Sequence, residues 1–381
     1  MSRTLIALSG GVDSAVAALL LMDAGRQVEA LFMTNWEEDE TGYCTSAADF
    51  QDARRICAEL GVPLHRVSFA ADYRSRVFAH FLDELRHGRT PNPDVPCNRE
   101  IKFGSGLAYA RRLGADRYAT GHYARIAPGP KLLRGVDESK DQSYFLHEVG
   151  ARELAYCEFP VGGLSKAEVR RIARERGLPV FDKRDSTGIC FVGERPFAEF
   201  IGAFLPAVPG PIETQEHVVI GTHRGLARYT LGQRSGLGIG GLQGAGEEPW
   251  FVAAKDTTRN ALVVVQGADH PALYSSGLRA GPPHWIAGAA PAAEFDCTVK
   301  LRHRQSDVPC RVTAAGNELG VRFGEPLKGA APGQYAVFYA GEECLGGAAI
   351  MTLATMEASC RTASDHAVSL PSRAGPMTIA R

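Results

Sequence analysis

The sequence lacks several features that would place its 381 residues in other classes of protein. No apolar run approaches the roughly 20 residues that a membrane-spanning helix needs; the longest, Ala15–Met22, has eight. No two of the nine cysteines form a C-x-x-C pair, which argues against a zinc knuckle or a local four-cysteine cluster. Positive charge is not in excess either, because 42 basic residues face 43 acidic ones. A nucleic-acid site must therefore be a local patch on a neutral protein.

The N-terminus also lacks a secretory signal, because a strand-like run, Thr4–Leu8, leads directly into a glycine cluster. We therefore expect a cytoplasmic protein without a membrane partner, whose cysteines are mostly free thiols. Apolar residues make up 45% of the chain and charged residues 22%, as in soluble globular proteins. The length favours two or three domains.

Strand-like and helix-like segments alternate over the first 125 residues, which predicts βαβ units and a parallel sheet. The expected strands cover residues 4–8, 28–33, 64–69 and 117–124. The expected helices cover residues 14–24, 47–60 and 72–86, and a capping box at Ser165 and Glu168 predicts another to about Arg176. Ligands of such sheets bind beyond the carboxyl ends of the strands.

The pattern changes after residues 206–211 and again near residues 281–283, where proline and glycine gather. Short strands at regular spacing follow, as in a small barrel or sandwich. We expect them at 217–220, 226–230, 250–253, 262–265, 295–301, 310–314, 319–323 and 336–339. The predicted domains are 1–205, 206–280 and 281–357, and the polar segment 358–381 is expected to be a disordered tail.

A glycine-rich loop with the sequence Ser9-Gly10-Gly11-Val12-Asp13-Ser14 lies between the first expected strand and helix. Its amides and the helix N-terminus offer positive charge to an anion, and its glycines allow close approach. The lysine of a Walker A loop is absent. The loop resembles the PP-loop of ATP pyrophosphatases, which implies cleavage between the α and β phosphates of ATP, with Asp13 placing Mg²⁺ or pyrophosphate. A ligand-free βα turn is the structural alternative.

Cys97 stands in unusual surroundings, because three prolines precede it within seven positions. Proline fixes its own φ angle and biases the residue before it, which predicts a rigid extended loop with Cys97 at its end. Arg99 and Lys102 follow closely in sequence, and cations lower the pKa of a thiol, whose thiolate is the nucleophile. Asp94, in the same loop, could accept or donate a proton.

Cys190 is the second unusual cysteine, because glycines and hydroxyl side chains surround it and Lys183 and Arg184 lie just upstream. We therefore interpret Cys97 and Cys190 as chemical residues. Cys44 follows an acidic loop and stays ambiguous. Five others are expected to be buried packing residues: Cys57, Cys157, Cys297, Cys310 and Cys344.

Taken in order, these segments resemble one family, the tRNA-specific 2-thiouridylases. The resemblance covers roughly residues 4 to 355 and rests on the ordered set rather than on any single motif. The matching segments are 7–14, 31–36, the Asn92-Pro-Asp94 loop with Cys97, 120–123, 140–145, 186–190, 230–234, 248–250, 302–305 and 332–334. Ser235 departs from the basic residue usual in the family, and His303 from the frequent tyrosine.

The resemblance implies an α/β protein with a PP-loop (adenine nucleotide alpha hydrolase-like) catalytic domain over 1–205. A small central β-rich domain that contacts tRNA and a C-terminal β-barrel would follow. It implies a sulfurtransferase that replaces the C2 oxygen of the wobble uridine (position 34) with sulfur. ATP, as its Mg²⁺ complex, would adenylate that oxygen, and AMP and pyrophosphate would be released. A persulfide on Cys190 would deliver the sulfur, supplied by a sulfur-relay protein or a cysteine desulfurase. Cys97 would assist as the nucleophile.

The same resemblance implies roles for individual residues, none of them as a resident metal ligand. ATP would be held by Ala7, Leu8, Ser9, Gly10, Gly11, Val12, Asp13 and Ser14, with Met33 and Gly121 lining the nucleotide site. The target base would contact Asn92, Pro93 and Asp94, the last as acid or base. The tRNA would contact His122, Lys140, Asp141, Gln142, Arg302, His303 and Gln334.

Other functions stay open from the sequence alone. An ammonia-dependent amide ligase would need a glutaminase nucleophile after Met1, where Ser2 stands, and has no use for the two cysteines. A 4-thiouridine synthetase would carry RNA-binding domains before the loop, and iron–sulfur tRNA thiolases need clustered cysteines. Another PP-loop enzyme that adenylates a carbonyl oxygen, or a tRNA-binding module without catalysis, remains possible.

Overall fold

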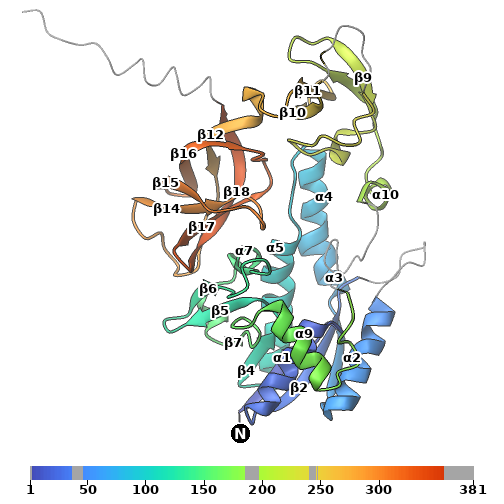
Figure 1. Ribbon diagram of the computed structural model, residues 1–381, viewed down its shortest axis with the longest axis vertical. Helices are drawn as coiled ribbons and strands as arrows, with labels where there is room; N and C mark the ends of the chain where they lie inside the picture. The colour runs from blue at the N-terminus through green and yellow to red at the C-terminus, as the bar shows by residue number, and fades with distance from the viewer. Residues whose placement is uncertain (1, 37–45, 185–196, 240–245, 247, 356–381) are drawn as a thin grey trace, which may run out of the picture.

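The first domain is built on a five-stranded sheet in which every pairing is parallel (Figure 1), as the alternation of segments predicts. The computed structural model describes residues 2–36, 46–184, 197–239, 246 and 248–355. The strand order is β3 (Leu64–Ser68), β2 (Gln27–Thr34), β1 (Arg3–Ala7), β4 (Arg117–Thr120) and β7 (Cys157–Glu158).

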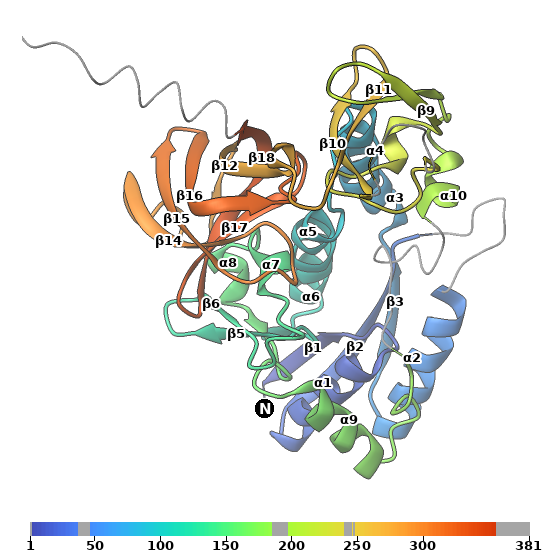
Figure 2. The same ribbon diagram turned by 45° about the horizontal axis from the view of Figure 1, so that its top comes forward.

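Helices cover both faces of this sheet. Successive residues of a strand point to opposite faces, so each strand contributes side chains to the core on either side. On β1, Ile6 packs into the core formed with α1 (Val12–Asp23), α2 (Ser46–Leu60) and α9 (Lys166–Glu175), which Figure 2 shows on one side of the sheet. Leu5, its neighbour, packs into the core of the opposite face. The predicted capping box at the start of α9 is confirmed by the reciprocal hydrogen bonds of Ser165 and Glu168.

Two long helices lie on the side of the second face, and Figure 1 shows α4 extending from the sheet toward the central domain. One runs without a break through α3 (Ala70–Tyr73), η1 (Arg74–Phe78) and α4 (Ala79–Arg86), and the other through α5 (Asp94–Pro96), η2 (Cys97–Gly106) and α6 (Leu107–Arg112). Both include a stretch of π-helix, η1 and η2. We call the second one the Asp94–Arg112 helix.

The prediction of an extended loop that ends at Cys97 is wrong, because the helix already begins at Asp94. Pro93 occupies the N-cap position and Pro96 the first turn. The first turn is the part of a helix that tolerates proline, since its amides have no partner inside the helix. The Asn92 side chain accepts a hydrogen bond from the Asp94 amide at 3.0 Å and so helps to start the helix.

The central domain is a four-stranded sheet in the order β10 (Trp250–Asp256), β11 (Ala261–Gln266), β8 (Gly210–Glu213) and β9 (Val219–His223). The prediction of a strand at 226–230 is wrong, because a short 3₁₀ turn, η3 (Leu226–Arg228), occupies that segment. Gly225 before it has φ +102°, and its amide donates to the His223 Nδ1 at 3.0 Å, so the chain turns instead of continuing as a strand. A short helix, α10 (Phe197–Gly202), precedes this domain.

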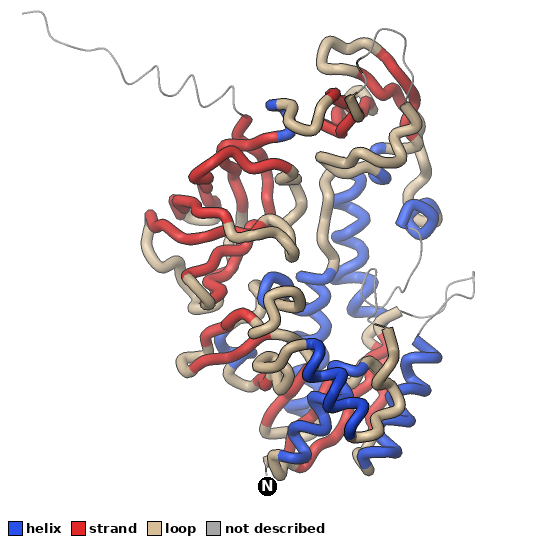
Figure 3. The backbone as a smooth tube through the Cα atoms, viewed as in Figure 1, coloured by secondary structure: helices blue, strands red, loops and turns tan. Residues whose placement is uncertain are grey.

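Six antiparallel strands form the C-terminal barrel, which Figure 3 shows as a separate group of strands. Its order is β12-β16-β15-β14-β17-β18, and the pairing of β12 with β18 closes it. The strands are β12 (Tyr274–Ala280), β14 (Glu294–Lys300), β15 (Val308–Ala315), β16 (Glu318–Lys328), β17 (Tyr335–Ala340) and β18 (Glu343–Thr355). The short β13 (His284–Trp285) pairs with β18, and a 3₁₀ turn, η4 (Pro271–Leu273), leads into the barrel.

A hairpin of the first domain joins this barrel. The strand expected over 117–124 is divided, since β4 ends at Thr120 and a new strand, β5 (Ala124–Ala127), pairs with β6 (Lys131–Arg134). Strand β6 in turn pairs with β18, so that Leu133 lies opposite Glu343. Sheet hydrogen bonds therefore run from the first domain into the barrel.

Buried side chains complete the contact between the first domain and the barrel. They come from α7 (Ser143–Leu146) and from the residues just before α8 (Ala151–Leu154). The Tyr144 hydroxyl donates to the Leu301 and Tyr335 carbonyls of the barrel at 3.2 and 3.1 Å. The His147 ring packs 4.9 Å from the Tyr335 ring, and its Nδ1 donates to the Tyr144 carbonyl at 2.7 Å. No described helix is long and apolar enough to cross a membrane. The predicted tail, 358–381, lies outside the described residues.

His147 makes folding stability depend on pH. Burial lowers its pKa to about 3, whereas an unfolded histidine titrates near 6.5. The unfolded chain therefore binds a proton between these values while the folded chain does not, and stability falls as the pH drops below about 6.5. We expect His147→Asn to remove about 2 kcal/mol of this loss between pH 6.5 and pH 5. Urea unfolding midpoints at several pH values measure it.

The matched control is His80→Asn, which replaces an exposed histidine of α4. An unchanged pH dependence in His147→Asn, relative to wild type and to this control, would contradict the assignment of the effect to His147.

Candidate active site

The loop Ser9–Ser14 closes on itself at the carboxyl end of β1. The Ser9 amide donates to the Ser14 hydroxyl at 3.2 Å, and that hydroxyl donates to the Gly11 carbonyl at 3.0 Å. Ala7, Leu8 and Val12 are buried and anchor the loop in the core of the domain. The serine hydroxyls and the start of α1 are therefore held together at the strand end, where a phosphate would meet amide donors.

Close packing fixes the loop from two sides. Gly10 has φ +79°, and a Cβ atom there would clash with the Asp49 carbonyl of α2. Gly121, after β4, lies directly against the loop, because a Cβ atom there would stand 2.7 Å from the Ser14 amide nitrogen. Both positions require glycine. Gly121 was predicted to line the nucleotide site, and the structure places it against the loop.

Asp13 is held by two side chains from other elements. Its Oδ1 accepts hydrogen bonds from the Tyr123 hydroxyl and the Lys166 Nζ, each at 2.7 Å, and its Oδ2 is 2.8 Å from the same Nζ. Sequence reasoning missed Lys166. A signal was present, because a lysine at the start of α9 opposes the positive end of the helix dipole and needs another reason to be there.

A second lysine, Lys183, contacts the loop from the opposite direction. Its Nζ donates to the Gly10 carbonyl at 3.1 Å, to Asp49 at 2.8 Å and to Asp52 at 2.7 Å. Burial disfavours its charge, but the bonds to the two carboxylates outweigh that cost and raise the pKa of Lys183. Lys166 and Lys183 therefore lie beside the loop, and both are paired with carboxylates there: Lys166 with Asp13, and Lys183 with Asp49 and Asp52.

Cys97 is fully buried in the first turn of η2. Burial raises the pKa of its thiol to about 12, although the positive charge of Lys102 acts in the opposite direction and the carboxylate of Asp94 adds to the rise. The expectation of a cation-activated thiolate is thus wrong for this conformation, because desolvation outweighs the nearby cation. The segment with Cys190, 185–196, lies outside the described residues.

The Asp94–Arg112 helix connects the region of Cys97 with the loop at β1. One turn after Cys97, the Lys102 Nζ lies 3.4 Å from the His122 Nε2, beside Gly121. Farther along the helix, a Cβ atom at Gly106 would stand 3.1 Å from the Met33 sulfur. His122 is buried, so this predicted tRNA contact faces Lys102 in the structure.

The chain just before the Asn92–Asp94 segment lies against the barrel. The Gln334 side chain donates to the Thr90 carbonyl at 2.6 Å, and the Thr90 amide donates to the Pro332 carbonyl at 2.8 Å. The structure therefore brings Gln334, a predicted tRNA contact, close to the residues predicted to touch the target base. Neither Gln334 nor Asn92 is buried.

Other predicted tRNA contacts surround the same junction. The His303 Nε2 donates to the Asp141 carbonyl at 2.5 Å, and its ring packs 4.5 Å from the Phe145 ring. The Asn98 side chain, one residue after Cys97, donates to the Phe145 carbonyl at 3.0 Å. The exposed Arg302 donates to the Gly329 carbonyl at 2.7 Å.

Two predicted tRNA contacts hold protein structure together instead of facing outward. The Asp141 carboxylate is buried and accepts hydrogen bonds from the Gly135 and Ser143 amides at 3.0 and 3.1 Å. The Gln142 side chain accepts from the Tyr123 amide at 3.0 Å. Their neighbour Lys140 is half-buried.

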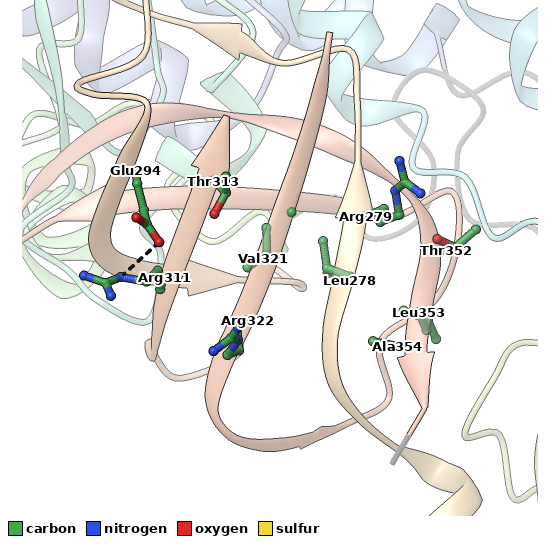
Figure 4. Close-up of a pocket in the computed structure, with 11 residues that line it drawn as sticks. Leu278, Arg279, Glu294, Arg311, Thr313, Val321, Arg322, Thr352, Leu353 and Ala354 are labelled. Carbon is green, nitrogen blue, oxygen red and sulfur yellow. Dashed lines mark ion pairs between the residues drawn. The ribbon is translucent and has the colours of Figure 1, made fainter. Parts of the chain in front are cut away.

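The remaining cysteines behave largely as expected. Four of the five predicted packing residues are buried, and Cys297 is half-buried with its sulfur 3.6 Å from that of Cys310. A hollow of about 380 Å³ lies elsewhere, on the barrel, and Figure 4 shows Arg279, Arg311 and Arg322 around it. None of the predicted site residues lines this hollow.

Comparisons with known families agree with this three-part organisation. A family model described as a tRNA methyl transferase HUP domain matches residues 2–194. A tRNA methyl transferase PRC-barrel domain matches residues 198–266, and an aminomethyltransferase beta-barrel domain matches residues 275–350.

Curated relatives match nearly the whole chain. The tRNA-specific 2-thiouridylase MnmA of Marinobacter nauticus is 54% identical over 92% of this chain and 91% of its own. The protein of the same name from Idiomarina loihiensis is 53% identical over 91% of this chain and 95% of its own. Among solved structures, a 4-thiouridine synthetase–RNA complex with bound ATP has a TM-score of 0.33 and 18% identity, over 51% of this chain and 46% of that one. That likeness is too weak to inform function.

The contact of Gly121 with the loop gives a sharp test of the nucleotide site. We expect Gly121→Ala to displace the loop and to weaken ATP binding by at least about tenfold, because a misfit of this kind typically costs 1–3 kcal/mol. Gly163→Ala is the matched control, because a Cβ atom there would meet nothing within 4 Å. Equilibrium titration with ATP measures both variants. Equal affinities would show that the loop near Gly121 does not hold the nucleotide.

Proposed function

The chain belongs to the family of the tRNA-specific 2-thiouridylases, and we propose that it catalyses ATP-dependent 2-thiolation of the wobble uridine of tRNA. One observation carries the proposal: the Asp94–Arg112 helix joins Cys97 to the phosphate-type loop at β1 through Lys102 and His122. A phosphate-activating site and a thiol are therefore parts of one structure.

Nucleotide binding is assigned to the loop Ser9–Ser14. Its amides and hydroxyls would hold the pyrophosphate part of ATP, and Lys166 and Lys183 would offset the carboxylates of Asp13, Asp49 and Asp52 beside it. Mg²⁺ enters as part of the ATP substrate. Lys166 already neutralises Asp13, so we assign Asp13 the role of holding the side chains of Lys166 and Tyr123 in place. Asp13 would position the phosphates only through these two side chains.

The chemistry requires two bond exchanges. The uracil O2 attacks the α-phosphorus of ATP, the bond to pyrophosphate breaks, and the N3 proton leaves to a base, for which Asp94 is the candidate. The terminal sulfur of a Cys190 persulfide then attacks C2, and the C2–O bond breaks so that the oxygen departs on AMP. Attack of the Cys97 thiolate on the Cys190 sulfur releases 2-thiouridine and leaves a Cys97–Cys190 disulfide, which an external thiol must reduce.

The burial of Cys97 sets a condition on these reaction steps. Burial raises the pKa of the Cys97 thiol, so the protonated thiol is the dominant form at pH 7 in this conformation. We propose that tRNA binding at the junction with the barrel opens the first turn of the Asp94–Arg112 helix and hydrates Cys97. Coupling of this kind would keep Cys97 from reacting with the Cys190 persulfide until the tRNA is bound. The source of the sulfur and the cytoplasmic location remain predictions from the sequence.

Methyl transfer, named in the descriptions of the matching family models, is the competing function. It would require a methyl donor and would yield methyluridine without pyrophosphate. The phosphate-type loop between β1 and α1 supports adenylation instead.

The two cysteines should separate adenylation from sulfur transfer. We expect Cys190→Ser and Cys97→Ser each to reduce 2-thiouridine formation by at least about 10³-fold, because a covalent carrier or resolving thiol is lost. Pyrophosphate release that depends on tRNA should continue. Mass spectrometry of tRNA nucleosides measures the product. Cys57→Ala, which removes a buried thiol of α2, is the control, and normal thiolation by Cys190→Ser would exclude its role.

Asp13 should act on the earlier step. Asp13→Ala leaves Lys166 without its partner, and we expect tRNA-dependent pyrophosphate release to fall by about 10²-fold or more while the Kd for tRNA changes little. Asp23→Ala, at the other end of α1, is the matched control, because it removes an exposed ion pair with Arg176. A pyrophosphate assay decides between them. Full activity in Asp13→Ala would remove this residue from the nucleotide site.

A further inference from the structure

The π-helical stretch η2 is unusual in length. It runs for ten residues, Cys97–Gly106, whereas π-helix normally appears as single-turn bulges, often at functional sites. Its hydrogen bonds join residue i to i+5, so Lys102 lies slightly more than one turn after Cys97. In an α-helix the same two positions would lie about 140° apart around the axis. The π-helix therefore brings Lys102 toward the side of Cys97.

The ammonium group of Lys102 is held in a defined place. It is 3.4 Å from the His122 Nε2, and because an ammonium group only donates, this nitrogen accepts. The His122 Nδ1 then carries the proton and donates to the Thr120 hydroxyl at 2.7 Å. Burial, followed by the charge of Lys102, keeps the pKa of His122 well below its usual value. A neutral His122 thus serves as a fixed acceptor.

The surroundings of His122 keep this acceptor rigid. Its ring centroid lies 5.8 Å from that of Phe103 and 6.0 Å from that of Phe159. The next residue toward β4 is Gly121, which packs against Ser14 of the nucleotide loop. Lys102 is therefore linked to the nucleotide loop through His122 and Gly121, and its charge also acts on Cys97.

We propose that Lys102 binds the α-phosphoryl group of the nucleotide during its transfer to the uridine and neutralises AMP as it leaves. This inference rests on the proposed thiolation. The adenylated uridine carries one negative charge on its phosphate. When sulfur attacks C2 and the C2–O bond breaks, the bonding electrons pass to the phosphate oxygen and AMP gains a second negative charge. A fixed cation between the nucleotide loop and Cys97 stabilises that charge where it develops.

The test is chemical rescue of Lys102→Ala. Removing one donor to a developing oxyanion typically costs 10²–10³-fold in rate, so we expect a loss of about that size in 2-thiouridine formation. The Kd for tRNA should change by less than about threefold, because Lys102 is assigned to the nucleotide. The loss should fall mainly on the rate, because the second negative charge develops only as AMP leaves. Added ethylammonium should restore at least about a tenth of the lost rate, and Lys102→Arg should keep part of it.

Lys131→Ala is the control for loss of a lysine, because Lys131 lies on β6 and pairs with Glu343. If the alanine variant fails to fold, Lys102→Met keeps the side-chain stem for packing and receives the same rescue. A rate within threefold of wild type, or a lost rate that ethylammonium does not restore, would overturn the assignment. Wild-type enzyme that makes no 2-thiouridine would refute the proposed function itself, so the two failures are distinguishable.

Discussion

The proposed site depends on one helix that connects the junction with the barrel to the region of the nucleotide loop. The Asp94–Arg112 helix begins beside the barrel, where prolines and Asn92 start it, and passes the nucleotide loop before it ends. Ten of its residues are π-helical. That geometry places the thiol of Cys97 and the charge of Lys102 on one helix. Under the proposed function, this helix would carry both the sulfur chemistry and a contact to the nucleotide.

The barrel completes the site because it is tied firmly to the first domain. The hairpin β5–β6 extends the sheet of the barrel, and Tyr144 fastens α7 to two of its carbonyls. As a result Gln334 and His303 of the barrel meet the chain around Thr90 and Asp141. A macromolecule that contacted the barrel at this junction would also lie close to the start of the Asp94–Arg112 helix. The proposed coupling of tRNA binding to exposure of Cys97 depends on that proximity.

Much of this arrangement could be predicted from the sequence, because its signals are local. Alternating segments predicted the parallel sheet, and the Ser165–Glu168 pair predicted the start of α9. Proline was misleading before Cys97, because the same ring restricts an extended loop and the first turn of a helix. The burial of Cys97 depends on contacts between distant segments, which no local pattern records. The position of Lys166 at the start of α9 was a local signal, but its partner Asp13 lies 153 residues away in the chain. Lys102 was visible near Cys97, but its link to His122 needed the π-helix.

The central claim is that the uracil oxygen leaves on AMP after adenylation beside a thiol. The most direct measurement uses tRNA whose target uridine carries ¹⁸O at O2, incubated with the enzyme, ATP, Mg²⁺ and a sulfide source. The account predicts AMP heavier by one ¹⁸O atom, in equal amount to the 2-thiouridine formed. Unlabelled AMP, or ADP and phosphate in its place, would contradict it.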